Sequence, residues 1–273
     1  MKYCVPYFNH FKYEEKVDEI IVPFNNSLGF FRALELKTSI HHSRIILQVE
    51  KDEDFYVYRE EYFPLFSELQ TNHPDLKIAF LFNKYMEDYV DLYEELKRRR
   101  LDFFFASRIR DWDTFHGMIE LGVSDIYIVE NLGFELDLLG PVAHAAGVSI
   151  RVFGNICQNS WAPRSGLKSF FIRPEDVPFY EPYVDVIEFF GVQKHEQEVM
   201  YKVYAIDKKW FGNLAEIIIG LNMDLDSRCL VAAFAPSRIG CGKKCLKGKP
   251  CNICDRILEL SQTLQDNEMM ITH

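Results

Sequence analysis

Short, almost continuously apolar runs alternate with longer amphipathic stretches along most of this chain. Continuous apolar runs of this length are typical of parallel strands that are buried on both faces. Each run is followed by a helix-like segment, which gives a repeating unit of roughly 20 to 30 residues. The runs cover residues 19–24, 44–49, 77–82, 102–106, 126–130, 149–153, 168–173 and 185–190.

Eight such units predict an α/β fold of the (β/α)8 TIM-barrel type. A doubly wound open sheet would give the same alternation, but no G-x-G-x-x-G follows the first run, and units of similar size favour closure. Closure would make residues 19–24 and 185–190 hydrogen-bonded neighbours. We expect the barrel to span residues 1–220, with residues 221–273 forming a small cysteine-rich appendage packed on it.

Composition and charge narrow the class of protein. Apolar residues make up 48% of the 273 residues, and the formal net charge is −10, which disfavours nucleic-acid binding except through the basic loop at 238–249. No apolar run reaches the ~18 residues that a membrane span needs. The first residues lack the apolar core of a signal peptide. Seven cysteines without a secretory signal favour a reducing compartment, so we expect a cytoplasmic protein.

Four thiols lie within fourteen residues near the end of the chain. Cys241, Cys245, Cys251 and Cys254 follow the spacing C-x3-C-x5-C-x2-C, with glycine and proline between them. That spacing lets four sulfurs converge on one ion, and the surrounding lysines would stabilise thiolates. We expect structural zinc, with a 4Fe–4S cluster as the alternative. The remaining interpretation is a reduced, metal-free thiol loop, or a disulfide pair if the protein were exported.

The second half of the chain resembles the peptidase U32 (collagenase-like) family over residues 115–205. Pro174 and Asp176 match a turn of that family, Gly191 matches the glycine after its next strand, and Lys194 matches the lysine that follows. The resemblance implies a (β/α)8 barrel. Its members include peptidases and proteins that help to hydroxylate ubiquinone precursors or RNA, several of which bind an iron–sulfur cluster through four cysteines.

The chain also departs from that family. The glutamate and arginine of its Lys-Ile-Glu-Gly-Arg strand end are replaced here by Phe190 and Val192, and its cysteine-bearing insertion is reduced to Cys157. The resemblance therefore supports the barrel fold but indicates no particular reaction.

Chemistry in a barrel lies where strands end and the following loops begin. Glu188 and Arg173 lie at or near the ends of neighbouring runs and could form an ion pair across the mouth, either as an anchor for substrate or as a stabilising salt bridge. Our candidate catalytic residues are Glu188, Arg173 and Lys194. Our candidate substrate-binding residues are Glu130, Asn155 and Asp176.

The sequence therefore favours a U32-peptidase-like barrel enzyme with a Cys4 metal site. Its reaction would be hydrolysis of the peptidase type or a hydroxylation, and its substrate a peptide or a small anionic molecule. The alternative is a catalytically silent barrel whose zinc-stapled tail serves as an interaction or assembly module.

Overall fold

The computed structural model describes residues 1–7, 11–24, 27–35, 40–50, 52–107, 109–129, 132–157, 167, 169–190, 193–221, 224–230, 232, 234–241 and 252–271. Within these residues, eight parallel strands form one sheet in the order β5-β4-β3-β2-β1-β8-β7-β6. The strands are β1 (Lys2–Pro6), β2 (Glu19–Pro23), β3 (Arg44–Val49), β4 (Lys77–Phe82), β5 (Asp102–Phe105), β6 (Asp125–Tyr127), β7 (Ser149–Phe153) and β8 (Val186–Glu188).

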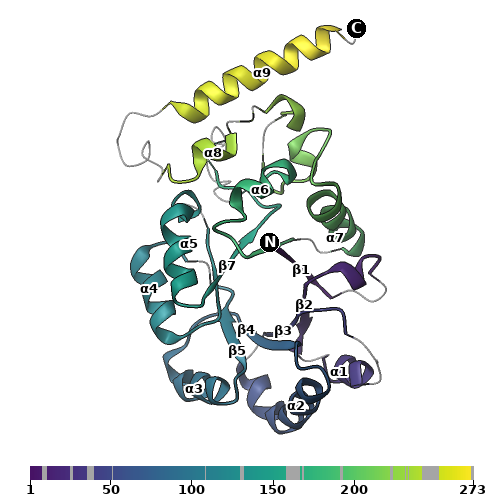
Figure 1. Ribbon diagram of the computed structural model, residues 1–273, viewed down its shortest axis with the longest axis vertical. Helices are drawn as coiled ribbons and strands as arrows, with labels where there is room; N and C mark the ends of the chain where they lie inside the picture. The colour runs from purple at the N-terminus through teal and green to yellow at the C-terminus, as the bar shows by residue number, and fades with distance from the viewer. Residues whose placement is uncertain are drawn as a thin grey trace.

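Helices surround the strands and cover their outer faces (Figure 1). They are α1 (Ser27–Glu35), α2 (Asp52–Asn72), α3 (Val90–Arg98), α4 (Trp112–Leu121), α5 (Leu136–Ala145), α6 (Val177–Tyr180) and α7 (Lys194–Tyr201). Local signals fix several ends: Asp111 accepts a hydrogen bond from the Thr114 amide at the start of α4, and Gly122 ends that helix with φ 80°.

The sheet curls into a nearly closed barrel. The gap between its edge strands β5 and β6 is bridged by the Ser124 amide, which donates to the Phe103 carbonyl at 2.9 Å. Just beyond both strands, the Ile109 amide donates to the Tyr127 carbonyl at 2.9 Å. The prediction of an α/β barrel of the TIM type is confirmed to this extent.

The predicted strand at 168–173 and the predicted pairing of 19–24 with 185–190 are wrong. Residues 2–6 form β1, which lies between β2 and β8 and pairs with both. The described residues 169–173 belong to none of the eight strands, although Phe171 and Ile172 are fully buried. Phe171 packs against Phe234, with ring centroids 5.3 Å apart. An apolar run thus signals burial, and here the burying partner is the tail.

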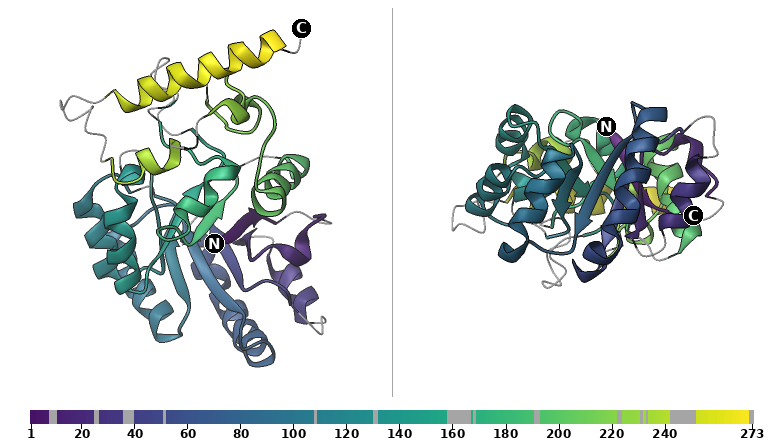
Figure 2. Two further views of the ribbon diagram at one scale, coloured as in Figure 1. Left: turned by 45° about the horizontal axis from the view of Figure 1, so that its top comes forward. Right: turned by 90° about the horizontal axis from the view of Figure 1, so that it is seen from below.

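The tail crosses one end of the molecule. It contains α8 (Phe234–Arg238) and the long α9 (Ile253–Ile271), which lies across the top of Figure 1 and is seen from a second side in Figure 2. Ile257 and Ser261 are buried on the inner side of α9. Among the described helices, none combines the length and apolar character that crossing a bilayer requires.

Candidate functional site

The interior of the barrel carries a connected set of charged side chains. Alternate residues of a strand face the same side of the sheet. Arg44 on β3, Asp125 on β6 and Arg151 on β7 occupy inward-facing positions, where their side chains contact one another. Arg151 is completely buried and Asp125 is 1% exposed. Isolated charges are costly in such a place, so their partners decide whether the site is stable.

Arg151 is the centre of this set. Its Nη1 lies 2.6 Å from Oε2 of Glu19 on β2 and 3.1 Å from Oδ1 of Asp125. Its Nη2 lies 3.4 Å from Oε2 of Glu188 on β8. The Arg151 guanidinium therefore links β7 to β2, β6 and β8 inside the barrel. Cys4, fully buried on β1, lies in the same interior, and burial raises the pKa of its thiol well above the usual value.

Arg44 extends the set toward the amino ends of the strands. Its Nη1 lies 2.7 Å from Oδ2 of Asp125, and its Nη2 lies 3.0 Å from Oδ2 of Asp102. The same Nη2 donates to the Ser124 hydroxyl oxygen at 2.8 Å. Burial opposes ionisation of Asp125, but the charges of Arg44 and Arg151 prevail and lower the pKa of this carboxyl. Asp102 and Asp125 belong to the two strands at the gap, so Arg44 ties the barrel together where ladder hydrogen bonds are few.

Glu188 lies nearer the carboxyl ends of the strands than the rest of the set. Its Oε2 accepts a hydrogen bond of 2.5 Å from the Tyr127 hydroxyl, in addition to the Arg151 contact. Its Oε1 has no hydrogen-bond partner among the described residues, and the side chain keeps 10% exposure. Burial raises the pKa of Glu188, while Arg151 and Tyr127 pull it back only in part. One carboxyl oxygen is therefore held, and the other is open.

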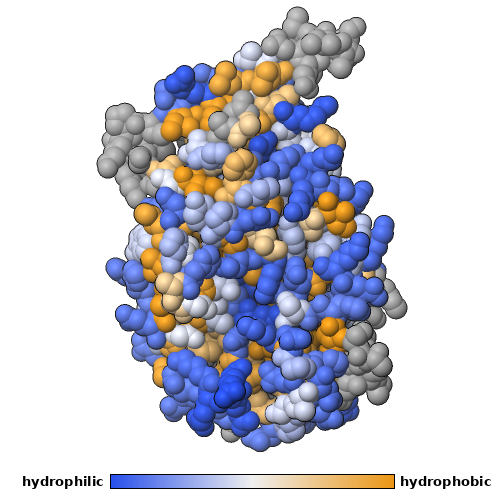
Figure 3. Space-filling view, viewed as in Figure 1, coloured by the Kyte–Doolittle hydropathy of each residue, from blue (hydrophilic) through white to orange (hydrophobic). Residues whose placement is uncertain are grey.

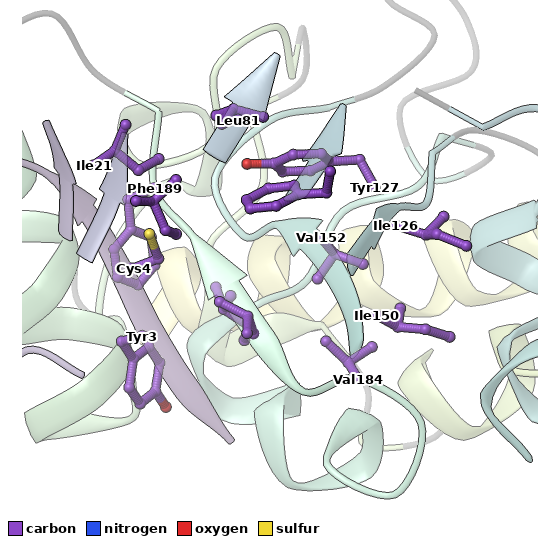
Figure 4. Close-up of a cluster of buried hydrophobic side chains, with 14 of the residues drawn as sticks. Tyr3, Cys4, Ile21, Leu81, Ile126, Tyr127, Ile150, Val152, Val184 and Phe189 are labelled. Atoms are coloured by element: carbon purple, nitrogen blue, oxygen red, sulfur yellow. The ribbon is translucent and has the colours of Figure 1, made fainter. Parts of the chain in front are cut away.

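Aromatic side chains lie close to this carboxyl, because Phe153 on β7 is the register partner of Glu188 on β8. Figure 4 shows Tyr127 within the cluster of buried hydrophobic side chains, with a second aromatic ring beside it. The Phe153 ring stacks on Tyr127 with centroids 5.3 Å apart, and Phe190 meets Phe153 edge to face at 6.5 Å. Phe190 is 48% exposed. Gln48, on the inward face of β3, is half-buried at the same end of the barrel. The described part of the mouth is thus mainly aromatic, with Glu188 at its base.

The other predicted catalytic residues do not join Glu188. The Arg173 guanidinium is taken by Asp176, with Nε–Oδ2 2.7 Å and Nη2–Oδ1 2.8 Å, so the expected Glu188–Arg173 pair is replaced by Glu188–Arg151. Arg173 also donates to the carbonyls of Ser227 and Leu230, both at 3.0 Å. Arg173 and Asp176 therefore fasten the tail to the barrel. Lys194 is 39% exposed and lies 3.8 Å from Glu198 on the same helix.

Two predicted substrate-binding residues have different outcomes. Asn155 follows β7 and clamps Phe190: its Nδ2 donates to the Phe190 carbonyl at 2.7 Å, and its Oδ1 accepts from the Phe190 amide at 2.8 Å. It therefore positions an aromatic residue of the mouth. Glu130 lies outside the described residues.

The predicted metal site is described only in part. Cys245 and Cys251 lie outside the described residues, whereas Cys241 and Cys254 are half-buried against the core. No group of three or more His, Cys, Asp or Glu side chains within the described ranges has metal-binding geometry. The site therefore stays a prediction.

Arg238, assigned to a basic loop by the sequence, is buried instead. Its guanidinium lies over the rings of Phe134, Phe171 and Phe234 at 4.9, 4.8 and 4.4 Å, and it donates to the Ser169 carbonyl. Residues 242–249 of that loop lie outside the described part of the chain.

A cavity of about 390 Å³ lies at the opposite end of the barrel from Glu188. Lys97, Arg100, Asp102 and Ser124 are among its lining residues, so it sits where helices return to strands β5 and β6. Residues at that end of a barrel usually serve stability. Asp102 and Ser124 fit that role, because both bind Arg44.

Sequence reasoning missed Tyr127, Arg151 and Arg44. A signal was present: each is a polar residue at an alternate position of an otherwise apolar strand. A charge inside such a strand must have a partner, and the partner must come from another inward-facing position.

No protein-family model, curated protein or solved structure matched this chain.

Proposed function

We propose that this protein is a (β/α)8-barrel enzyme in which Glu188 exchanges a proton with a substrate bound at the mouth. The observation that carries the proposal is the asymmetry of the Glu188 carboxyl. Oε2 is held by Tyr127 at 2.5 Å, while Oε1 has no partner among the described residues. A general acid–base needs one fixed geometry and one oxygen within reach of the substrate.

The surroundings of Glu188 support both of its protonation states. Burial favours the protonated form and raises its pKa, which brings the carboxyl toward the range in which general acids and bases work best. Tyr127 and Arg151 stabilise the carboxylate when the proton has left. Glu188 is the last residue of β8, and the active sites of (β/α)8-barrel enzymes lie at the carboxyl-terminal ends of the strands.

The resemblance to the peptidase U32 family suggests hydrolysis as the reaction, with hydroxylation as the alternative. In hydrolysis, Oε1 would take a proton from water as the water oxygen bonds to the substrate carbonyl carbon. The carbon–nitrogen bond would then break, and Glu188 would return its proton to the leaving nitrogen. No charge on the protein changes over the whole cycle.

Hydrolysis of fluorogenic peptides and labelled gelatin tests this function. We expect Glu188→Gln to lower kcat at least 100-fold with little change in Tm, since removing a general acid–base typically costs 10²–10⁴-fold. Glu68→Gln, on the exposed side of α2, is the matched control. If the parent cleaves these substrates and Glu188→Gln cleaves them equally well, Glu188 is not the proton-transfer group.

For the tail, we propose a structural zinc ion or a 4Fe–4S cluster held by Cys241, Cys245, Cys251 and Cys254. One of the two described thiols, Cys254, supports it. Cys254 and Tyr180 are acidic groups close enough to Arg238 to oppose the lowering of its pKa that burial causes. A guanidinium beside thiolates would offset part of the negative charge of a Cys4 site.

A second candidate function is a catalytically silent barrel whose tail binds another protein. The observation that favours it is a set of exposed apolar residues on α9, on the face next to the buried Ile257. Ile253, Leu260 and Leu264 are 44%, 56% and 46% exposed, and apolar residues gather over this end of the surface in Figure 3. A Leu260→Gln, Leu264→Gln variant that loses a co-purifying partner while Glu188→Gln changes nothing would favour this candidate.

A further inference from the structure

We propose that the barrel mouth binds a small organic cation, a protonated amine or an amidinium, whose N–H group donates to Oε1 of Glu188 beside the Phe153 and Phe190 rings. This inference rests on the proposed function in taking Glu188 as the central group of the site. It adds the chemical class of the ligand, and it replaces the small anion expected from the sequence.

The first argument is the charge balance inside the barrel. Among the deeply buried groups, the guanidinium groups of Arg44 and Arg151 face the carboxylates of Glu19, Asp125 and Glu188. The half-exposed Lys2, 3.7 Å from Glu19, and Asp102, 3.0 Å from Arg44, add one charge of each sign. The described interior therefore keeps one negative charge when all its acids are ionised.

The second argument places that charge at Glu188. Arg151 lies 2.6 Å from Glu19 and 3.1 Å from Asp125 but 3.4 Å from Glu188. Asp125 has Arg44 as a further partner at 2.7 Å. Glu188 is thus the least compensated of the three carboxylates. It is also the one nearest the mouth, where a ligand can supply the missing cation.

The third argument is the lining of the mouth. The faces of aromatic rings carry negative electrostatic potential and attract ammonium and guanidinium groups within about 6 Å. Phe190 is 48% exposed, and Asn155 holds its backbone with two hydrogen bonds. A carboxylate beside aromatic rings, one of which is 48% exposed, suits a cation and disfavours an anion.

The anion expected from the sequence has no receptor in the described mouth. Arg173, which was to hold it, spends its guanidinium on Asp176 and on two tail carbonyls. Arg151 is completely buried below Glu188, and its Nη atoms face carboxylates. An incoming anion would therefore meet Glu188 before it met either guanidinium.

Three probes of one shape test the charge preference: benzylamine, which is cationic at pH 7.5, benzyl alcohol, which is neutral, and benzoate. Binding to the full chain is followed by NMR titration. We expect benzylamine to bind at least about tenfold more tightly than benzyl alcohol, in line with the strength of charge-assisted hydrogen bonds. Benzoate should bind more weakly than either.

Variants locate the binding. Glu188→Gln should remove the preference for benzylamine over benzyl alcohol, and Phe190→Leu should weaken benzylamine binding about three- to tenfold. Phe211→Leu, whose ring is 67% exposed away from the barrel interior, is the matched aromatic control and should change nothing. Tm values of all variants check that each is folded.

The outcomes separate this inference from the proposed function. Equal binding of benzyl alcohol or benzoate, binding that survives Glu188→Gln, or no binding of benzylamine overturns the cation site. If peptide hydrolysis still depends on Glu188 in that case, the proton-transfer function stands without the cation. If benzylamine binds through Glu188 but no hydrolysis occurs, the cation site stands and the hydrolase assignment falls.

Discussion

The Tyr127 hydroxyl donates a hydrogen bond of 2.5 Å to Oε2 of Glu188, joining β6 to β8 across the interior of the barrel. The two residues are 61 positions apart in the chain. The bond fixes the plane of a buried carboxyl whose second oxygen is open. This pair, with Arg151 beneath it, is the feature from which the functional proposals follow.

Tyr127→Phe removes this hydrogen bond with little change in shape. The Glu188 carboxylate then loses a donor that favours its charged form, so we expect the pKa of Glu188 to rise further. The free energy of unfolding should fall by about 1–3 kcal/mol, the usual cost of leaving a buried acceptor without its partner. NMR titration of the Glu188 side chain and urea denaturation measure the two effects. An unchanged pKa in a folded variant would contradict the assigned contact.

Glu188→Gln changes how stability depends on pH. The folded-state pKa of Glu188 is raised above its unfolded value, so the folded protein holds this proton more tightly than the unfolded chain does. The resulting stabilisation is complete below the unfolded pKa and is lost as pH rises through the folded pKa. We therefore expect the parent to lose stability relative to Glu188→Gln from acidic pH upward until the folded pKa is passed. Urea denaturation at a series of pH values tests this, and a parallel pair of curves would contradict it.

Arg151→Met leaves Glu19, Asp125 and Glu188 buried with one cation fewer. Breaking a buried ion pair by removing one partner typically costs about 3–5 kcal/mol, and here three carboxylates share the loss. We expect a large fall in the free energy of unfolding, measured by urea denaturation. Arg99→Met is the matched control, because Arg99 is 44% exposed and its pair with Glu95 should contribute about 1 kcal/mol or less.

Arg173→Met should release the tail and, because it leaves the buried Asp176 without its partner, should also lower the free energy of unfolding. Arg173 holds the carbonyls of Ser227 and Leu230, so its loss frees the start of the tail from the Pro174–Asp176 turn. Limited proteolysis should then cut after about residue 220 and leave a resistant barrel fragment. Proteolysis that degrades the whole chain at one rate would show that the barrel and the tail unfold as one unit.

The tail should contain one zinc ion, or one 4Fe–4S cluster, per chain. Elemental analysis of protein purified without chelator, anaerobically for the cluster, measures this directly. Cys251→Ser should lower metal content at least tenfold and loosen the tail, whereas Cys4→Ser, inside the barrel, should leave the metal in place. Protein that contains neither zinc nor iron would favour a reduced, metal-free thiol loop.

The sequence by itself determined the class of fold and the place of one important residue. Apolar runs at regular spacing, too continuous for half-exposed strands, indicated parallel strands covered by helices. Glu188, near the end of the run at 185–190, indicated a carboxyl at the barrel mouth. The thiol spacing likewise defined four candidate metal ligands. These inferences depend on local pattern, which the chain carries in consecutive residues.

Only the tertiary structure decided which residues meet. Period-two alternation gives the face of a strand, but the stagger of strands around the barrel sets which inward residues share a level. In the folded chain Glu188 contacts Tyr127 and Arg151, whereas Arg173 binds a backbone carbonyl of the tail. The run at 168–173 could not be told from a strand, because burial against α8 and burial in a sheet select the same apolar residues.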